Sequence, residues 1–334
     1  MPTGPTTAQV EGHDLDNFAS NDYLGLTWHP GVRAAFARGG GTGSARLITG
    51  NRPAHEALED RLEQVHGRPA LLFPSGYHAN LALLATVTEP GDVVASDALN
   101  HASIIDGLRL GRAERVVIDH DQPGQIPRGA RLAVCEGLFS MDGDIVDLRR
   151  WTGDHWLAVD EAHAVGALGP GGRGVAAGQG VVPDFIVGTL GKAFGVAGAF
   201  VVGPPELRSL LVSAGRAFVF TTGVPEPLAH AALVALDVAD DERRARLAQN
   251  AARLRQGLRQ VGAEVLGHAH VVPVVTGDRT MDVAARLLAA GILAPGIRFP
   301  TVPRGRERIR FTVSSEHSPV QVDRCIDAVA QALR

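Results

Sequence analysis

The sequence predicts an α/β protein with a large, mostly parallel sheet domain and a smaller C-terminal α/β domain. Short apolar runs alternate with helical patterns, as in chains built from strand–helix–strand units. The runs are continuously apolar, which is typical of strands covered on both faces. After residue 225 the pattern changes, because a long charged helix precedes a second, shorter set of strands and helices.

Seven runs in the first part are expected to form strands. They span residues 69–73, 92–96, 114–119, 131–136, 155–160, 184–189 and 198–203. The stretch LALLATV at 81–87 is expected to be helical, and glycine turns such as GPGGRG at 169–174 separate the elements.

The second part is expected to begin with a helix over 241–262, in which five apolar residues recur at steps of four and three: Leu247, Ala251, Leu254, Leu258 and Val261. Strands are predicted at 270–275, 291–299 and 308–314, and helices at 281–291 and 321–333. We therefore divide the chain into an N-terminal segment (1–45), a large domain (46–225) and a small C-terminal domain (226–334).

Composition excludes several classes of protein. The 334 residues carry a net charge of -4 without a long run of one sign, which argues against a nucleic-acid or polybasic membrane surface. Cys135 and Cys325 lie far apart in apolar segments, so a disulfide framework or a zinc site is not expected and a cytoplasmic location is favoured. The N-terminus lacks the pattern of a signal peptide, and no apolar run approaches the ~20 residues that span a bilayer.

Lys192 is the only lysine among 32 basic residues. A coding bias toward arginine could leave one lysine by chance. Arginine supplies charge and anion contacts as well as lysine does, but only lysine can lose its proton and become a nucleophilic amine for Schiff-base chemistry. Composition alone leaves both explanations open, so the neighbouring residues must decide.

Several polar groups follow predicted strands, where α/β proteins gather their functional residues. Ser75, Gly76 and Tyr77 follow the strand at 69–73 and begin a helix, whose free N–H groups can bind an anion; a plain helix cap is the alternative. Asp160 ends the strand at 155–160 and could pair with a cationic ring nitrogen or form a structural salt bridge.

Three further groups complete a candidate site. His163 follows Asp160, His101 follows the strand at 92–96, and Thr189 and Lys192 follow the strand at 184–189. Either histidine could instead be structural. An anion cradle, a carboxylate, a ring that can stack and an isolated amine together match what pyridoxal phosphate requires.

The residues DEAH at 160–163 also suggest a helicase-type NTPase. That class needs a GxxxxGK[ST] phosphate loop. Around Lys192 the first glycine position is Ile186, the residue after the lysine is Ala193, and the lysine follows the acidic box, so this alternative is remote.

The chain resembles the α-oxoamine synthases, fold-type I pyridoxal phosphate enzymes that join an amino acid to an acyl thioester with loss of carbon dioxide. The resemblance runs from about Asn17 to the C-terminus. It rests on NDYLGL (21–26), GTGSARLITG (41–50), HEALEDRLEQVHG (55–67), LLFPSGYHAN (71–80), LNHASIIDG (99–107), EGLFSMDGD (136–144), VDEAHAVGALGPGGRG (159–174), TLGKAFGVAGAFVVG (189–203), FVFTT (218–222) and FPTVPRGRERIRFTVSSEH (299–317).

The resemblance implies a role for each matching residue at the cofactor. Lys192 binds it covalently and later moves protons at the substrate Cα, Asp160 pairs with the ring nitrogen, and His101 stacks on the ring. His163 and Ser140 lie near the ring oxygen. The phosphate is held by Ser75, Gly76, Tyr77 and Thr189.

The resemblance also implies a homodimer with a shared active site, in which Thr221 or Thr222 reaches the cofactor phosphate of the other subunit. Arg310 binds the carboxylate of the amino acid, and Asn21 and Thr301 line the substrate pocket.

Within the family, GKAFGVAGAFVV and FPTVP are most similar to the biotin-pathway members, which condense L-alanine with a pimeloyl-CoA or pimeloyl-carrier-protein thioester to 8-amino-7-oxononanoate. DEAHAVG and FTT are also similar to the members that use glycine and succinyl-CoA, while the 2-amino-3-ketobutyrate CoA ligases match PTVP less well. Only 20 residues precede Asn21, and two connections are short, so a compact variant that accepts a secondary-metabolite acyl carrier is a further alternative. Two alternatives are not synthases: a pyridoxal phosphate fold that has lost its activity, and an enzyme with a different pyridoxal phosphate reaction such as simple aldol cleavage.

Overall fold

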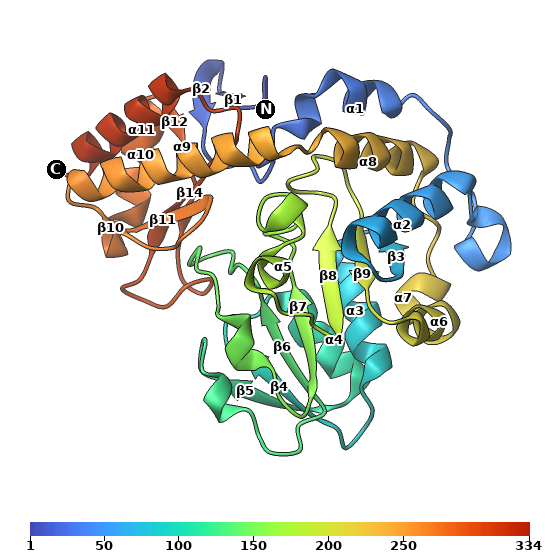
Figure 1. Ribbon diagram of the computed structural model, residues 1–334. Helices are drawn as coiled ribbons and strands as arrows, with labels where there is room; N and C mark the ends of the chain where they lie inside the picture. Colours follow the sequence, from blue (N-terminus) through green and yellow to red (C-terminus); the bar gives the residue numbers. More distant parts are fainter. The chain divides into compact units, whose positions relative to one another are not determined.

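The computed structural model describes all residues, Met1–Arg334, and they form two compact units. The first unit contains Met1–Trp28, Phe139–Ile145 and Ala239–Arg334, and the second contains His29–Leu138 and Val146–Val238. The segment Phe139–Ile145 thus belongs to the first unit although both of its neighbours in the sequence belong to the second. Figure 1 shows the course of the chain through both units.

The second unit is built on a seven-stranded sheet. In spatial order its strands are β3 (Ala70–Phe73), β9 (Ala199–Val202), β8 (Phe185–Thr189), β7 (Trp156–Asp160), β6 (Leu132–Glu136), β4 (Val93–Asp97) and β5 (Glu114–Ile118). Only β9 runs antiparallel to its neighbours β3 and β8. The carboxyl ends of β4, β6, β7 and β8 therefore meet at one edge of the sheet.

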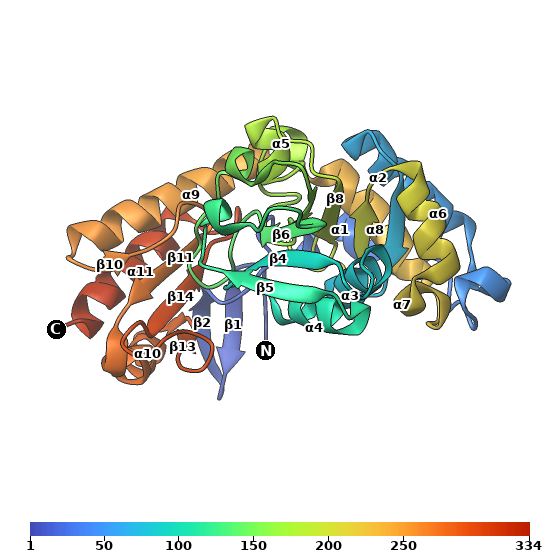
Figure 2. The same cartoon turned by 90° about the horizontal axis from the view of Figure 1, so that it is seen from below.

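Eight helices accompany this sheet. They are α1 (Pro30–Ala35), α2 (Pro53–His66), α3 (Gly76–Val87), α4 (Ala102–Gly111), α5 (Val175–Gln179), α6 (Pro205–Ala214), α7 (Arg216–Val219) and α8 (Glu226–Val238). Seen from below in Figure 2, α3 and α4 lie on one side of strands β4 to β6 and α5 lies on the other. Helices on both faces explain why these strands are continuously apolar.

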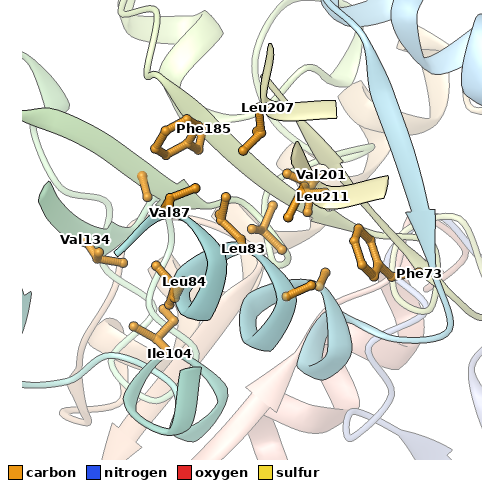
Figure 3. Close-up of a cluster of buried hydrophobic side chains, with 14 of the residues drawn as sticks. Phe73, Leu83, Leu84, Val87, Ile104, Val134, Phe185, Val201, Leu207 and Leu211 are labelled. Carbon is orange, nitrogen blue, oxygen red and sulfur yellow. The ribbon is translucent and has the colours of Figure 1, made fainter. Parts of the chain in front are cut away.

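The core beneath α3 is formed by aliphatic and phenylalanine side chains (Figure 3). Leu83 and Leu84 of α3 are fully buried and pack among Val134, Val201 and Leu211. A buried leucine contributes about 1.5–3 kcal/mol relative to an exposed one. This packing fixes α3, and with it the first turn of α3 at the carboxyl edge of the sheet.

Helices α3 and α4 approach each other closely at Gly107. A Cβ atom at this position would lie 2.8 Å from the carbonyl oxygen of Asn80 and 3.1 Å from the Cβ of Leu84. Only glycine fits such a backbone contact without displacement. The approach brings polar residues near the start of each helix within reach of one another.

The first unit contains two small sheets and three helices. One sheet orders β1 (Thr7–Val10), β2 (His13–Asn17) and β12 (Ile292–Leu293), and the other orders β10 (Glu264–Val265), β11 (Val271–Val275), β14 (Arg308–Thr312) and β13 (Gly296–Ile297). The helices are α9 (Asp241–Gln260), α10 (Thr280–Ala289) and α11 (Pro319–Ala332). Helices α9 and α11 pack together, as Figure 1 shows.

The structure confirms the seven predicted strands of the large sheet and the two strands at 271–275 and 308–312. The single strand predicted at 291–299 is wrong. Pro295 interrupts it, so β12 pairs with β2 and β13 pairs with β14 in different sheets. Proline lacks the N–H that a continuous ladder needs.

The contact-based units do not follow the predicted segment limits. Helix α8 lies in the sheet unit, and Met1–Trp28 lies with the C-terminal segment. The division into an N-terminal segment (1–45), a large domain (46–225) and a small C-terminal domain (226–334) stays a prediction.

Candidate functional site

Asp160 ends strand β7 at the carboxyl edge of the sheet. Its side-chain oxygens are both held, because Oδ2 accepts a hydrogen bond from Asn80 Nδ2 at 2.7 Å and Oδ1 accepts one from Ala162 N at 2.9 Å. The residue is 8% exposed. The carboxylate therefore has a fixed orientation before any ligand binds.

Lys192 lies in the loop that joins β8 to β9, and this loop is closed by its own hydrogen bonds. Thr189 Oγ1 donates to Gly198 O at 3.1 Å and accepts from Gly191 N at 3.2 Å. Gly195 N donates to Lys192 O at 2.9 Å. The loop thus holds the backbone of Lys192 beside the end of β8.

Glu136 ends strand β6 and is paired in register with Asp160. Burial and then the charge of Asp160 raise the pKa of Glu136 well above its ordinary value, while the charge of Lys192 opposes this rise. Lys192, Glu136 and Asp160 therefore act on one another electrostatically at the same edge of the sheet.

His101 occupies the N-cap of α4. Its backbone N–H donates to Glu136 Oε1 at 2.7 Å, and its ring Nδ1 lies 2.7 Å from Ser103 Oγ. The residue is exposed, whereas both of these partners are buried. The ring is anchored on one side and leaves its face accessible to a flat ligand.

The first turn of α3 is suited to an anion. Ser75 Oγ caps the helix by accepting from His78 N at 3.3 Å. The N–H groups of Gly76 and Tyr77 have no acceptor within the helix, as at every α-helix start. A Cβ at Gly76 would meet nothing within 4 Å, so the backbone faces open space there. The Tyr77 hydroxyl donates to Asp106 of α4.

Glu161 has a structural environment. It is 0% exposed, and its carboxylate accepts hydrogen bonds from Val175 N at 3.0 Å and Ala176 N at 2.7 Å. Burial raises the pKa of Glu161 to about 7, although these two hydrogen bonds lower it. Glu161, the second acidic residue of the DEAH sequence, therefore holds the start of α5. This structural role gives the NTPase alternative no support. His163 is buried two residues further on.

In the first unit, two of the three residues predicted to bind substrate, Arg310 and Asn21, lie together, next to Ser140, which was predicted to bind the cofactor. Arg310 of β14 donates through Nε to Ser140 O at 2.5 Å, and its Nη1 lies 3.4 Å from Asn21 Oδ1. The Tyr23 hydroxyl also donates to Asn21 Oδ1, at 3.1 Å. Thr301 lies in an exposed segment, where its backbone N–H donates to Arg298 O.

The residues of the second unit fit pyridoxal phosphate. An ionisable acid, an amine, an accessible imidazole face and an open helix start stand at one edge of a single sheet, and each matches a different part of the cofactor. The predicted residues Thr221 and Thr222 follow α7, where an isolated bridge pairs Thr222 with Ala45.

Sequence reasoning missed Asn80, Ser103 and Glu136. Glu136 could have been found, because it ends the apolar run at 131–136 in the same way that Asp160 ends the run at 155–160. Asn80 and Ser103 lie inside helices α3 and α4, and no local pattern distinguishes them from ordinary polar residues.

The sequence profile described as aminotransferase class I and II matches residues 14–329. An 8-amino-7-oxononanoate synthase from Anaeromyxobacter sp. (strain K) is 44% identical over 360 residues, covering 99% of this chain and 90% of the relative. One from Pseudomonas entomophila is 40% identical over 99% of this chain and 91% of the relative. This chain belongs to the α-oxoamine synthases, within the aminotransferase class I and II family.

Solved structures of other α-oxoamine synthases share the fold. Sphingomonas wittichii serine palmitoyltransferase matches with a TM-score of 0.93 and 33% identity, covering 99% of this chain and 90% of that one. Francisella tularensis 8-amino-7-oxononanoate synthase matches with a TM-score of 0.83 and 27% identity, covering 95% and 97%. The predicted fold-type I architecture and the family resemblance are thereby confirmed.

Proposed function

We propose that the protein is a pyridoxal phosphate-dependent acyltransferase that condenses L-alanine with a pimeloyl thioester. The products would be 8-amino-7-oxononanoate, carbon dioxide and the free thiol of coenzyme A or a carrier protein. The observation that supports this proposal most directly is the sequence identity of about 40% or more with 8-amino-7-oxononanoate synthases over nearly the whole chain. The edge of the large sheet supplies the groups that this chemistry needs.

Pyridoxal phosphate supplies, when bound, an electron-withdrawing ring that stabilises negative charge at the Cα of an amino acid. In this proposal Lys192 would hold the cofactor covalently, and its amine would accept the proton from the substrate Cα. Asp160, with both oxygens fixed, would keep a proton on the ring nitrogen. His101 would position the ring by stacking, and His163 and Ser140 would bond its oxygen.

The phosphate of the cofactor would lie at the first turn of α3. Ser75 shapes this turn as its cap, the N–H groups of Gly76 and Tyr77 donate to the phosphate, and Thr189 adds its hydroxyl. Because the helix N-terminus is the positive end of its dipole, it favours an anion.

Substrate recognition would fall to the residues of the first unit. A guanidinium fork binds a carboxylate through two parallel hydrogen bonds, so Arg310 suits the carboxylate of the amino acid. Asn21 already lies within reach of Arg310 and would orient it, and Thr301 would line the pocket.

A homodimer is part of the proposal. Leu47, Ile48 and Phe220 are 48%, 75% and 72% exposed, which is costly for large apolar side chains unless a partner covers them. The bridge between Ala45 and Thr222 places their two segments side by side. A second copy covering this surface would bring Thr221 and Thr222 to the interface, as a shared active site requires.

No helix in the structure combines the length and the apolar character needed to cross a bilayer. A cytoplasmic location stays a prediction from the sequence.

The decisive assay pairs amino acids with thioesters and follows release of thiol and carbon dioxide. L-alanine, glycine and L-serine would each be combined with pimeloyl-CoA, a pimeloyl-carrier protein, succinyl-CoA and palmitoyl-CoA. We expect the highest kcat/KM for L-alanine with a pimeloyl donor. Preference for serine and palmitoyl-CoA would favour the activity named for the Sphingomonas wittichii structure. Amino acid cleavage without thiol release would contradict the synthase proposal altogether.

A further inference from the structure

A buried amide joins the carboxylate of Asp160 to helix α4. Asn80 on α3 is 3% exposed, and its Nδ2 donates to Asp160 Oδ2 at 2.7 Å and to Ser103 Oγ at 3.0 Å. An ionised carboxylate only accepts hydrogen bonds, so the NH₂ group of Asn80 must face it. Both amide protons are then used, one by each partner.

Ser103 also contacts the ring of His101 through two of its groups. The backbone N–H of Ser103 donates to His101 Nδ1 at 3.3 Å, and Ser103 Oγ lies 2.7 Å from the same nitrogen. Because Nδ1 accepts the backbone N–H, it carries no proton, and the serine hydroxyl must donate to it as well. These two contacts fit the tautomer that carries its ring proton on Nε2.

Glu136 connects His101 to the strand next to Asp160. Its Oε1 accepts from the backbone N–H of His101 at 2.7 Å, and its Cα lies opposite that of Asp160 in the β6–β7 ladder. Hydrogen bonds therefore link Asp160 to His101 through Asn80 and Ser103, and Glu136 links His101 to strand β6, which pairs with the strand of Asp160.

The path depends on the close contact of two helices. Asn80 belongs to α3 and Ser103 to α4, and Gly107 lets the α4 backbone approach the carbonyl of Asn80 itself. Buried polar groups are costly unless their partners are present, so each member of the network constrains its neighbours.

We propose that Asn80 and Ser103 are positioning residues that tie the orientation of Asp160 to the orientation and tautomer of His101. The network itself does not depend on the proposed function, but its effect on the cofactor ring does. Asp160 would meet the edge of the cofactor ring and His101 its face, so a shared framework sets the tilt of the ring relative to both. Neither positioning residue touches the reacting atoms.

The first test needs no cofactor. In the apoprotein, ¹⁵N NMR of the histidine rings, assigned with a His101→Gln variant, should show His101 with its proton on Nε2. Ser103→Ala removes the shorter of the two contacts to Nδ1 and leaves only the 3.3 Å backbone bond, and Asn80→Ala frees the serine hydroxyl to rotate, so each variant should shift the His101 signal toward a mixture of tautomers. A protonated Nδ1 in the wild-type protein, or an unchanged His101 signal in both variants, would overturn the inference whatever the activity of the enzyme.

The second test measures the dissociation constant of pyridoxal phosphate by fluorescence for the wild type, Asn80→Ala, Ser103→Ala and the double variant. A hydrogen bond to a charged group is worth about 1.5–3 kcal/mol, so Asn80→Ala should weaken binding by about ten- to hundredfold. If the two residues act as one path, the double variant should bind only slightly more weakly than Asn80→Ala. Multiplicative effects would contradict a shared path.

Asn250→Ala is the matched control. Asn250 of α9 also donates through Nδ2 to two acceptors, Ser314 O and His317 O, but it lies in the first unit. It should leave the His101 signal and the cofactor affinity unchanged. Should Asn80→Ala fail to fold, Asn80→Ser and Ser103→Ala test the same path. A wild type that binds no pyridoxal phosphate would refute the proposed function, whereas the NMR result would still decide the network.

Discussion

Glutamine in place of Glu161 should change how the stability of the protein depends on pH. Glu161 is fully buried and accepts two backbone N–H groups at the start of α5. Burial, with a smaller contribution from the charge of Asp160, raises the pKa of its carboxyl from an ordinary 4.5 to about 7. The folded protein thus keeps the proton over a pH range in which the unfolded chain has lost it.

The sign and size follow from proton linkage. Between pH 4.5 and 7 the folded state binds the extra proton, so the free energy of unfolding falls as the pH rises. The difference between about 7 and 4.5, at about 1.4 kcal/mol for each pH unit, corresponds to about 3 kcal/mol. This loss is complete above pH 7 and absent below pH 4.5. Glutamine does not titrate, so Glu161→Gln removes this slope.

The assay is urea unfolding of the wild type and Glu161→Gln at pH 5, 6, 7 and 8. The free energy of unfolding of the variant, minus that of the wild type, should increase by about 2.5 kcal/mol from pH 5 to pH 8, because part of the loss has already occurred at pH 5. Glu63→Gln makes the same chemical change at an exposed position of α2. A difference for Glu161→Gln that stays constant across this range, or that matches the Glu63→Gln control, would refute the reasoning.

Three further outcomes are expected. Lys192→Arg keeps the charge but lacks a primary amine, so thiol release should fall to background and the absorbance of bound cofactor near the visible edge should vanish; turnover in this variant would contradict the mechanism. Arg308→Met removes the donor to Met141 O and Asp142 Oδ1 from a side chain that is 3% exposed, and should cost about 3–5 kcal/mol in urea unfolding, whereas a cost below 1 kcal/mol would show that the pair is dispensable. Gly107→Ala should lower Tm through about 1–3 kcal/mol of overpacking between α3 and α4, and an unchanged Tm would mean that the helices separate freely.

The large sheet could be predicted because burial on both faces leaves a local signature. Between their first residues, His155 and Asp184, and their polar ends, the runs at 155–160 and 184–189 lack polar side chains, so the strands and the place of Asp160 follow from the same letters. The run at 291–299 also lacks polar side chains up to Arg298. This run forms two short strands, because Pro295 lacks an N–H and because the two parts pair with different partner strands. The run itself does not specify those partners.

The hairpin β1–β2 shows a second kind of limit. Its strands are polar and exposed in part, so the search for continuous apolar runs did not predict them. The only local signal in the sequence was Gly12, and in the structure both Glu11 and Gly12 have positive φ, as a tight hairpin turn requires. In the site, Lys192 was found through its uniqueness in the composition. Asn80 and Ser103 were not found, because their importance arises only where two helices meet in space.

The segment Phe139–Ile145 has a consequence for how the protein can be divided. The backbone passes between the two units after residues 28, 138, 145 and 238, so neither unit is a continuous stretch of sequence. A fragment that stops at Val238 would retain this seven-residue loop but lose Arg308 and Arg310, whose guanidinium groups grip its carbonyl oxygens. The gene therefore cannot be cut once to yield two self-sufficient halves. A cut between residues 145 and 308 separates the loop that carries Ser140 from the arginines that hold it, and a cut between residues 29 and 138 divides the second unit.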